Sequence, residues 1–156
     1  HVDWQLSGGS GVKTVYAEIK NGSGTVRSAN DSILLTLPGP VLALGSSTLD
    51  FALQIDGPAS QTATLLILNT GGDTLTWTLT EEPAASWLTA VPTNGTIAAG
   101  ANTAVTLTAS RTGLSPAVYT TTLRVDAGSA DNSPQFVTVT FLLTDQAPLF
   151  LPTVMK

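Results

Sequence analysis

The chain has 156 residues, of which 42% are hydrophobic and 11% charged, and its formal net charge is −5. Six Lys and Arg residues are too few to build a phosphate-binding surface, so we expect no nucleic-acid partner. Cysteine is absent, which excludes disulfides and thiolate metal sites. No stretch approaches the roughly 20 apolar residues that cross a bilayer, so we also expect no membrane span.

The first 38 residues contain three predicted strands and no helical periodicity. Apolar and polar residues alternate with the period of a half-buried strand, and the predicted strands are residues 2–6, 12–20 and 31–37. Glycine-rich sequences between them are typical of turns, because glycine adopts positive φ readily. Pro-Gly-Pro at 38–40 then ends the pattern, since proline fixes φ and cannot donate to a sheet. We place a domain boundary there.

The next section of the chain contains at least seven further strands, with Gly-, Pro-, Asn- and Asp-rich turns between them. They are residues 48–53, 61–69, 74–80, 86–90, 102–109, 117–126 and 135–144, with a short eighth near 96–98. Seven short strands over about 100 residues are typical of an antiparallel, immunoglobulin-like β-sandwich. A small β-barrel is the alternative. The predicted fold class is therefore all-β: such a sandwich of seven or eight strands, preceded by a partial β-repeat.

The alternation within each strand predicts which side chains face the core. Trp77 lies between Leu75 and Leu79 and alternates with threonines, so its ring should be buried. Tyr119 follows the loop 112–118, and we expect a buried ring whose hydroxyl bonds to a backbone group in or near 109–115, as in a tyrosine corner. The predicted structural core includes Trp77, Tyr119, Leu65, Ile67, Leu107, Val139 and Phe141.

Four segments occur in an order that is typical of one known family. They are NTGGDTLTWTL (69–79), SWLTAVPTNGTIAAG (86–100), TGLSPAVYTTTLRV (112–125) and NSPQFVTVTF (132–141). Through them, residues 42–144 resemble the BACON family of bacterial immunoglobulin-like modules. The resemblance implies a sandwich in an extracellular, multidomain bacterial protein, often beside hydrolase domains, and a family for which carbohydrate or mucin binding has been proposed. It implies no catalytic residues.

The sequences VDWQLSGGSGVKTVYAEI and NGSGTVRSANDSILL, within residues 2–35, resemble the last strands of another bacterial immunoglobulin-like or fibronectin-III-like repeat. We therefore predict the end of a preceding domain at 1–38, a BACON-type sandwich at 41–145 and a C-terminal tail at 146–156. The closing LFLPTVMK looks like the short hydrophobic tails of some secreted bacterial proteins. We expect a portion of a longer secreted or cell-surface bacterial protein, whose other domains are its partners.

The sequence offers no parts for catalysis. The single histidine is His1, at a terminus, so no Ser–His or Cys–His pair can form. The adjacent carboxylates Glu81 and Glu82 are interpreted as solvated. Asp126 and Asp131 flank a loop and could form at most a calcium site, and we interpret them as turn residues. We expect no enzyme activity, no metal and no cofactor.

Carbohydrate binding requires an exposed aromatic face with polar neighbours. Trp4 and Trp77 share faces with Leu or Val and are assigned to the core, whereas the face of Trp87 is ambiguous. Trp87 is therefore the candidate ligand-binding residue, while Phe136 and Tyr16 point outward without forming a patch. The predicted function is a non-catalytic structural or spacer module, with attachment to a hydrolase as one form of the parent protein. The alternative is a carbohydrate- or cell-surface-binding module.

Residues 1–38 present an apolar face that needs a cover. We expect the segment to be ordered and to bury this face against another copy of itself, pairing edges across a two-fold axis to form a homodimer. Packing on the sandwich near Leu66 and Leu68 is the competing solution. The apolar face comprises Trp4, Val15, Ala17, Ile19, Ile33, Leu35 and Leu37.

Overall fold

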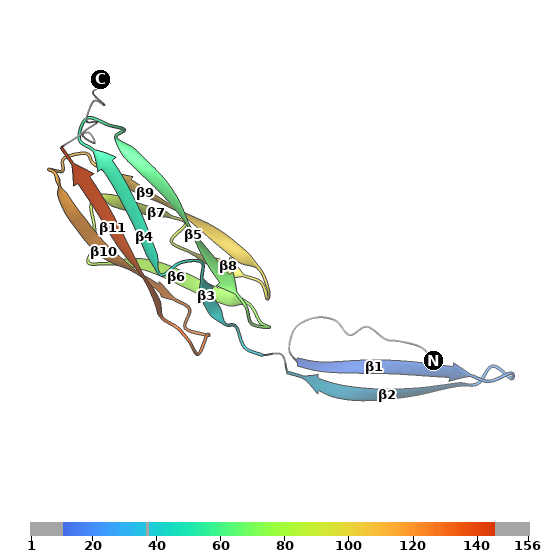
Figure 1. The fold of residues 1–156 in the computed structure, drawn as a ribbon. Coiled ribbons are helices and arrows are strands. Elements are labelled where there is room, and N and C mark those ends of the chain that lie inside the picture. Colours follow the sequence, from blue (N-terminus) through green and yellow to red (C-terminus); the bar gives the residue numbers. More distant parts are fainter. Residues whose placement is uncertain (1–10, 37, 146–156) are drawn as a thin grey trace, which may run out of the picture.

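The computed structural model describes residues 11–36 and 38–145, which form a two-stranded hairpin followed by a β-sandwich (Figure 1). The hairpin consists of β1 (Gly11–Lys20) and β2 (Val26–Leu35). Among residues 11–36 and 38–145, no helix that could span a membrane is found. The strands of the sandwich are β3 (Leu42–Leu44), β4 (Thr48–Gln54), β5 (Ser60–Asn69), β6 (Leu75–Glu82), β7 (Leu88–Val91), β8 (Asn94–Ile97), β9 (Asn102–Ser110), β10 (Ala117–Asp126) and β11 (Gln135–Thr144).

The hairpin is closed by the loop at 21–25. The Asn21 side-chain oxygen accepts hydrogen bonds from the backbone N–H groups of Ser23 (3.2 Å) and Thr25 (2.8 Å). This closure lets β2 begin at Val26, so the predicted start at Asp31 is wrong. The residues between Val26 and Asp31 are mostly polar, so they show no apolar–polar alternation that would predict a strand. The predicted strand at 2–6, with Trp4, and the predicted tail lie outside the described residues.

The sandwich has two sheets, of five strands (β4-β11-β10-β6-β8) and four strands (β3-β5-β9-β7). Every neighbouring pair is antiparallel, as predicted, except β4 and β11, which are parallel. Nine strands are present, because the three-residue β3 was missed and the short eighth strand is β8. The immunoglobulin-like β-sandwich itself is confirmed.

The chain changes sheets between β3 and β4. β3 pairs with β5, and β4 then pairs with β11 in the opposite sheet. Glycine suits this crossing, because a Cβ on Gly45 would lie 3.1 Å from the Leu66 Cβ, a tighter contact than most side chains make. At the outer edge of β4, the Ala52 N–H donates to the side-chain oxygen of Gln61 at 2.9 Å. That edge therefore has a side chain on one of its backbone donors.

The core lies between the two sheets, and alternate residues of nearly every strand contribute to it. Threonine occupies many of the outward positions, which explains why it is the commonest residue of the chain. The predicted core residues are all buried except Tyr119, which packs against the core but is only partly buried. Tyr119 lies near the start of β10, directly after Val118, which is 62% exposed. Fully buried side chains include Trp77, Phe51, Phe141, Leu65, Ile67, Leu107 and Leu123.

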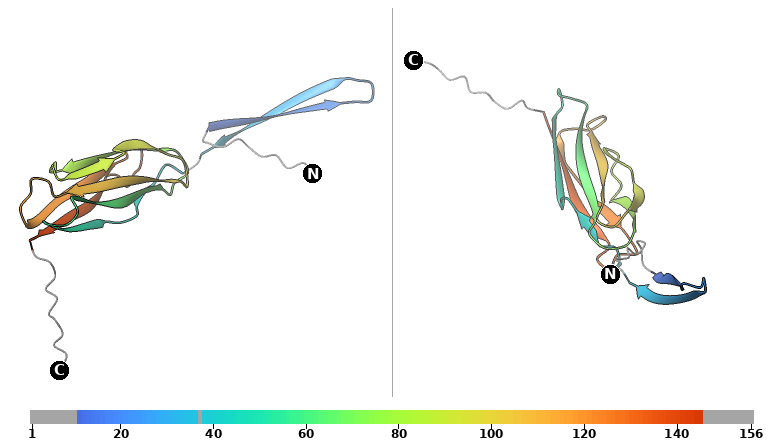
Figure 2. Two further views of the ribbon diagram at one scale, coloured as in Figure 1. Left: turned by 90° about the horizontal axis from the view of Figure 1, so that it is seen from above. Right: turned by 90° about the vertical axis from the view of Figure 1, so that its right-hand side faces the viewer.

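The hairpin extends away from the sandwich, to which it is joined through residues 38–40 (Figure 2). Leu66 is 40% exposed on the outer face of the four-stranded sheet. The competing cover, in which residues 1–38 fold back onto Leu66 and Leu68, is therefore not formed by the described part of the hairpin.

Candidate functional site

Trp87 belongs to a cluster of three aromatic rings inside the sandwich. Its ring centroid lies 5.5 Å from that of Phe141 and 6.3 Å from that of Tyr119. Trp87 is 7% exposed. The segment is held by a hydrogen bond from the Ser110 N–H to the Trp87 carbonyl oxygen, at 2.8 Å. A sugar therefore cannot stack on this ring without unpacking the core.

Tyr119 makes the hydrogen bond that the sequence predicts. Its hydroxyl donates to the Ser115 carbonyl oxygen at 2.7 Å, so the loop before β10 is tied to the strand that follows it. This is the geometry of a tyrosine corner. The residue has a structural role and carries no polar group toward a ligand.

The outward face of the five-stranded sheet carries an exposed aromatic side chain beside charged and hydroxyl groups. The strand register places Phe136 of β11 beside Arg124 of β10, and Arg124 beside Thr80 of β6. Glu82 and Thr138 lie in the adjoining row, each opposite Thr122. We call this surface the Phe136 face, and it consists of Thr80, Glu82, Thr122, Arg124, Phe136 and Thr138.

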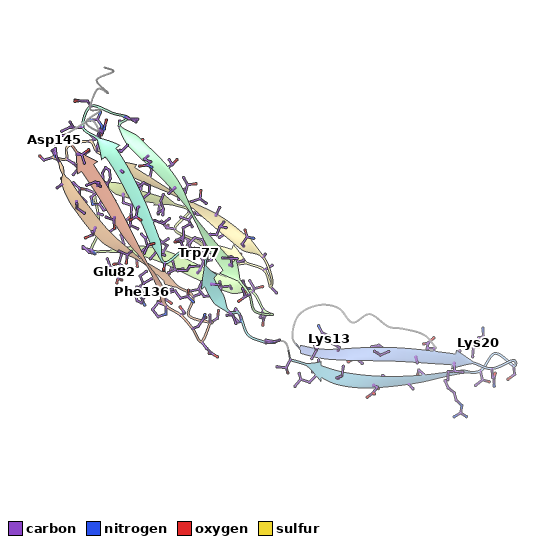
Figure 3. The ribbon with its side chains drawn as sticks, in the orientation of Figure 1. Lys13, Lys20, Trp77, Glu82, Phe136 and Asp145 are labelled. Atoms are coloured by element: carbon purple, nitrogen blue, oxygen red, sulfur yellow. The ribbon has the colours of Figure 1, made fainter. Side chains whose placement is uncertain are left out.

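Phe136 is 52% exposed on this face. Figure 3 shows Phe136 and Glu82 projecting from the same side of the sandwich, whereas Trp77 lies within it. The Arg124 guanidinium forms an ion pair with the Asp126 carboxylate, and both side chains remain about one third exposed. An aromatic ring among hydroxyl groups and a fixed ion pair can pack against sugar C–H groups and hydrogen-bond sugar hydroxyls.

The two aspartates considered for calcium are not brought together as a metal site. Asp126 pairs with Arg124 and also accepts a 3.3 Å hydrogen bond from the Ser133 hydroxyl. Ser133 in turn accepts the Ala127 N–H at 2.7 Å, which closes the loop 127–133. Asp131 is exposed. In residues 11–36 and 38–145, no three His, Cys, Asp or Glu residues cluster as metal ligands.

The most connected polar residue is Asn69, which the sequence analysis did not single out. It is 1% exposed. Its amide nitrogen donates to the carbonyl oxygens of Asp73 (2.6 Å) and Ile97 (3.1 Å). Its side-chain oxygen accepts the N–H groups of Gly71 (3.0 Å) and Val41 (3.3 Å). Asn69 therefore joins the start of the sandwich to two loops and is structural.

The glycines that follow Asn69 have a related function. The Gly72 N–H donates to the carbonyl oxygens of Pro38 and Gly39, at 3.2 and 3.3 Å. A Cβ on Gly72 would lie 2.8 Å from the Pro38 oxygen. Only glycine fits beneath the linker at this distance, so the Asn-Thr-Gly-Gly sequence anchors the chain where it enters the sandwich.

Comparison with known proteins gives one family and many structures. The family model described as Viral BACON domain matches residues 45–141. No curated protein matches the sequence. A protein of unknown function from Porphyromonas gingivalis W83 is 21% identical, with a TM-score of 0.57, 91% of this chain covered and 69% of that one. Because residues 42–156 make up less than three quarters of this chain and the match covers 91% of it, the match also includes part of residues 1–41.

Two further structures share the sandwich. The ASH / PapD-like domain of human CEP192 is 11% identical, with a TM-score of 0.58 and coverage of 73% of this chain and 92% of that domain. A putative carbohydrate binding protein from Bacteroides ovatus ATCC 8483 is 13% identical, with a TM-score of 0.53, 67% of this chain covered and 37% of that one. At these identities the likeness concerns the fold.

Proposed function

Because the chain belongs to the family of the Viral BACON domain, we propose that it is a non-catalytic accessory module of a larger secreted or cell-surface bacterial protein. Within that protein it serves as a spacer that holds neighbouring domains apart, such as a hydrolase and the surface to which it is attached. One observation carries this proposal: β4, which follows the short first strand of the sandwich, and β11, its last strand, run parallel and are paired with each other.

The pairing of β4 with β11 suits a spacer under load. Seven residues are in register, from Thr48 opposite Thr138 to Gln54 opposite Thr144. Beyond them, the Thr138 N–H donates to the Ser47 oxygen at 2.9 Å and the Ile55 N–H to the Thr144 oxygen at 2.8 Å. The linker from the hairpin and the C-terminal end of β11 lie at opposite ends of the sandwich (Figure 1). Tension between the start of β4 and the C-terminal end of β11 would therefore load this row of hydrogen bonds in shear.

The burial of the aromatic residues supports the same function. Trp77 is 1% exposed and Trp87 7% exposed. The side chains best suited to stacking on a ligand thus stabilise the sandwich. A spacer needs a rigid core and no ligand.

Single-molecule pulling on the ends of the chain tests the spacer. In β4 the backbone groups of alternate residues face β11, and the Ala52 N–H, which faces Gln61, fixes which residues these are. Leu49→Pro removes a donor that faces β11, whereas Asp50→Pro removes one that faces away. We expect the unfolding force to fall with Leu49→Pro and to change little with Asp50→Pro. Equal effects, or no force peak for the parent chain, would contradict a spacer that resists tension.

The Phe136 face favours a second candidate function, the binding of carbohydrate on a glycan or cell surface. Phe136 is the exposed aromatic residue of the described sandwich, and it lies beside the Arg124–Asp126 ion pair. A glycan array followed by calorimetry tests this function. Binding should disappear with Phe136→Ala and weaken with Arg124→Ala. Tyr16→Ala, which removes an exposed ring from the hairpin, should leave it unchanged. Binding that survives Phe136→Ala would exclude this face.

A further inference from the structure

β2 has an open edge that nothing in the described part of the chain covers. It pairs with β1 alone, in a sheet of two strands. Two-stranded hairpins are marginally stable in water, and an open edge is a template for another strand. Apolar residues of the hairpin are exposed on both of its faces, with Ile19 at 72% and Leu34 at 69%. Within residues 11–36 the hairpin therefore has no further strand to stabilise it.

The hydrogen bonds of the hairpin show which residues of β2 can accept another strand. The Asn21 N–H bonds to the Thr25 carbonyl oxygen at 3.0 Å, so this pair is hydrogen-bonded. Such pairs alternate along an antiparallel ladder. Arg27, Ala29 and Asp31 therefore bond toward β1, opposite Ile19, Ala17 and Val15. The backbone groups between them, at Ser28 and Asn30, point to the open edge.

The charges along β2 select one partner register. Arg27 and Asp31 have no ion-pair partner within the described residues, and each lies opposite an aliphatic residue of β1. If two β2 strands pair antiparallel about an axis at Ala29, Arg27 of each copy lies opposite Asp31 of the other. The outward backbone groups of Ser28 then meet those of Asn30. Several registers would let the outward backbone groups of two β2 strands pair. Only this one places Arg27 directly opposite Asp31 of the other copy.

We propose that β2 pairs with β2 of a second copy about a two-fold axis at Ala29, forming a continuous four-stranded sheet. The two Arg27–Asp31 pairs occupy non-hydrogen-bonded positions, where facing side chains are closest. Alanine at the axis leaves the centre free of bulky side chains. The Asp31 carboxylate, which accepts the Ser32 N–H at 2.9 Å in the single chain, exchanges this bond for Arg27 of the second copy. The proposal is independent of the spacer and carbohydrate functions.

Sedimentation equilibrium of the 156-residue chain from about 1 to 200 μM tests the proposal. We expect a reversible dimer. Arg27→Asp or Asp31→Arg alone should weaken it about tenfold or more, because each places two like-charge pairs across the axis. The combined exchange, Arg27→Asp with Asp31→Arg, should restore it. Lys20→Asp and Glu18→Arg make the same charge changes on β1 and should leave the dimer intact.

Three results would overturn the proposal: a monomer over the whole range, single and combined exchanges with equal effects, or β1 controls as damaging as the β2 variants. Amide exchange provides a second measurement that does not depend on a variant. The Ser28 and Asn30 N–H groups should gain protection as the concentration rises. Ser28→Pro should remove the dimer while the sandwich keeps its near-ultraviolet circular dichroism. A dimer that persists with Ser28→Pro would also contradict pairing at this edge.

Discussion

The hairpin and the sandwich are built from the same kind of strand but differ in what covers them. In β5, Leu65 and Ile67 alternate with polar or half-exposed residues and are 1% and 0% exposed. In the hairpin, Ile19 and Ile33 alternate in the same way, yet they are 72% and 56% exposed. Alternation thus determines that a strand forms and which side chains share a face. Burial depends on a second layer, which nine strands supply and two do not.

The largest expected effect comes from replacing one aromatic ring in each region and comparing the changes in the free energy of unfolding. Trp77→Ala should lower the free energy of unfolding by about 3–5 kcal/mol, because it removes buried apolar surface and leaves a cavity in the core. Tyr16→Ala should change it by less than about 0.5 kcal/mol, since this ring is 69% exposed. Urea titration followed by circular dichroism measures both. If the two variants unfold alike, the core assignment is wrong.

A second test compares two asparagines. Asn69→Ala should cost about 2–3 kcal/mol, because the Val41 and Gly71 N–H groups and two carbonyl oxygens lose a buried partner. Asn30→Ala, on the exposed hairpin, should have an effect of less than about 0.5 kcal/mol. Thermal unfolding at a concentration that keeps the chain monomeric provides the measurement. A small effect at Asn69 would mean that its loops are held in another way.

Removal of one hydroxyl gives a smaller effect. Tyr119→Phe loses the bond to the Ser115 oxygen and should destabilise the sandwich by about 0.5–1.5 kcal/mol. Tyr16→Phe is the matched change in the hairpin and should be neutral within error. Denaturation in urea distinguishes them. Identical midpoints for Tyr119→Phe and the parent would show that the loop needs no such bond.

The smallest effect is expected when the hairpin is deleted. A chain that begins at Leu37 keeps Pro38 and Gly39, which the Gly72 N–H binds, and keeps every strand of the sandwich. Its melting temperature should match that of the parent within a few degrees. A large loss of stability would mean that the hairpin is part of the same cooperative unit.

Most of the fold could be predicted from the sequence, because alternation is a local property. Trp77, Leu107 and Val139 are buried where the pattern places them. The parallel pairing of β4 and the Phe136 face could not be predicted. Both depend on which strands become neighbours, and the alternation within one strand does not specify its neighbour.

Asn69 was missed for a related reason. Its four side-chain hydrogen bonds reach residues from Val41 to Ile97, so no local pattern reveals them. The signs in the sequence were its place at the end of an apolar strand and at the start of the segment 69–79 that carries the family resemblance. The division at 38–40 and the identity of residues 1–38 as the end of another domain stay predictions.

Gln61 bears on a hazard that β-sandwiches with open edges share. When similar sandwiches are crowded along one chain or surface, an open edge invites a strand from a neighbour, and aggregates grow by such exchanges. Gln61 places its side-chain oxygen on the Ala52 N–H, at the edge of β4. An incoming strand would first have to displace this intramolecular hydrogen-bond acceptor. The Gln61 amide thus hinders strand pairing at the edge of β4. The outward N–H groups of Ser28 and Asn30 on β2 have no such side chain on them within the described residues, so the edge of β2 is the more accessible edge for a strand of another molecule.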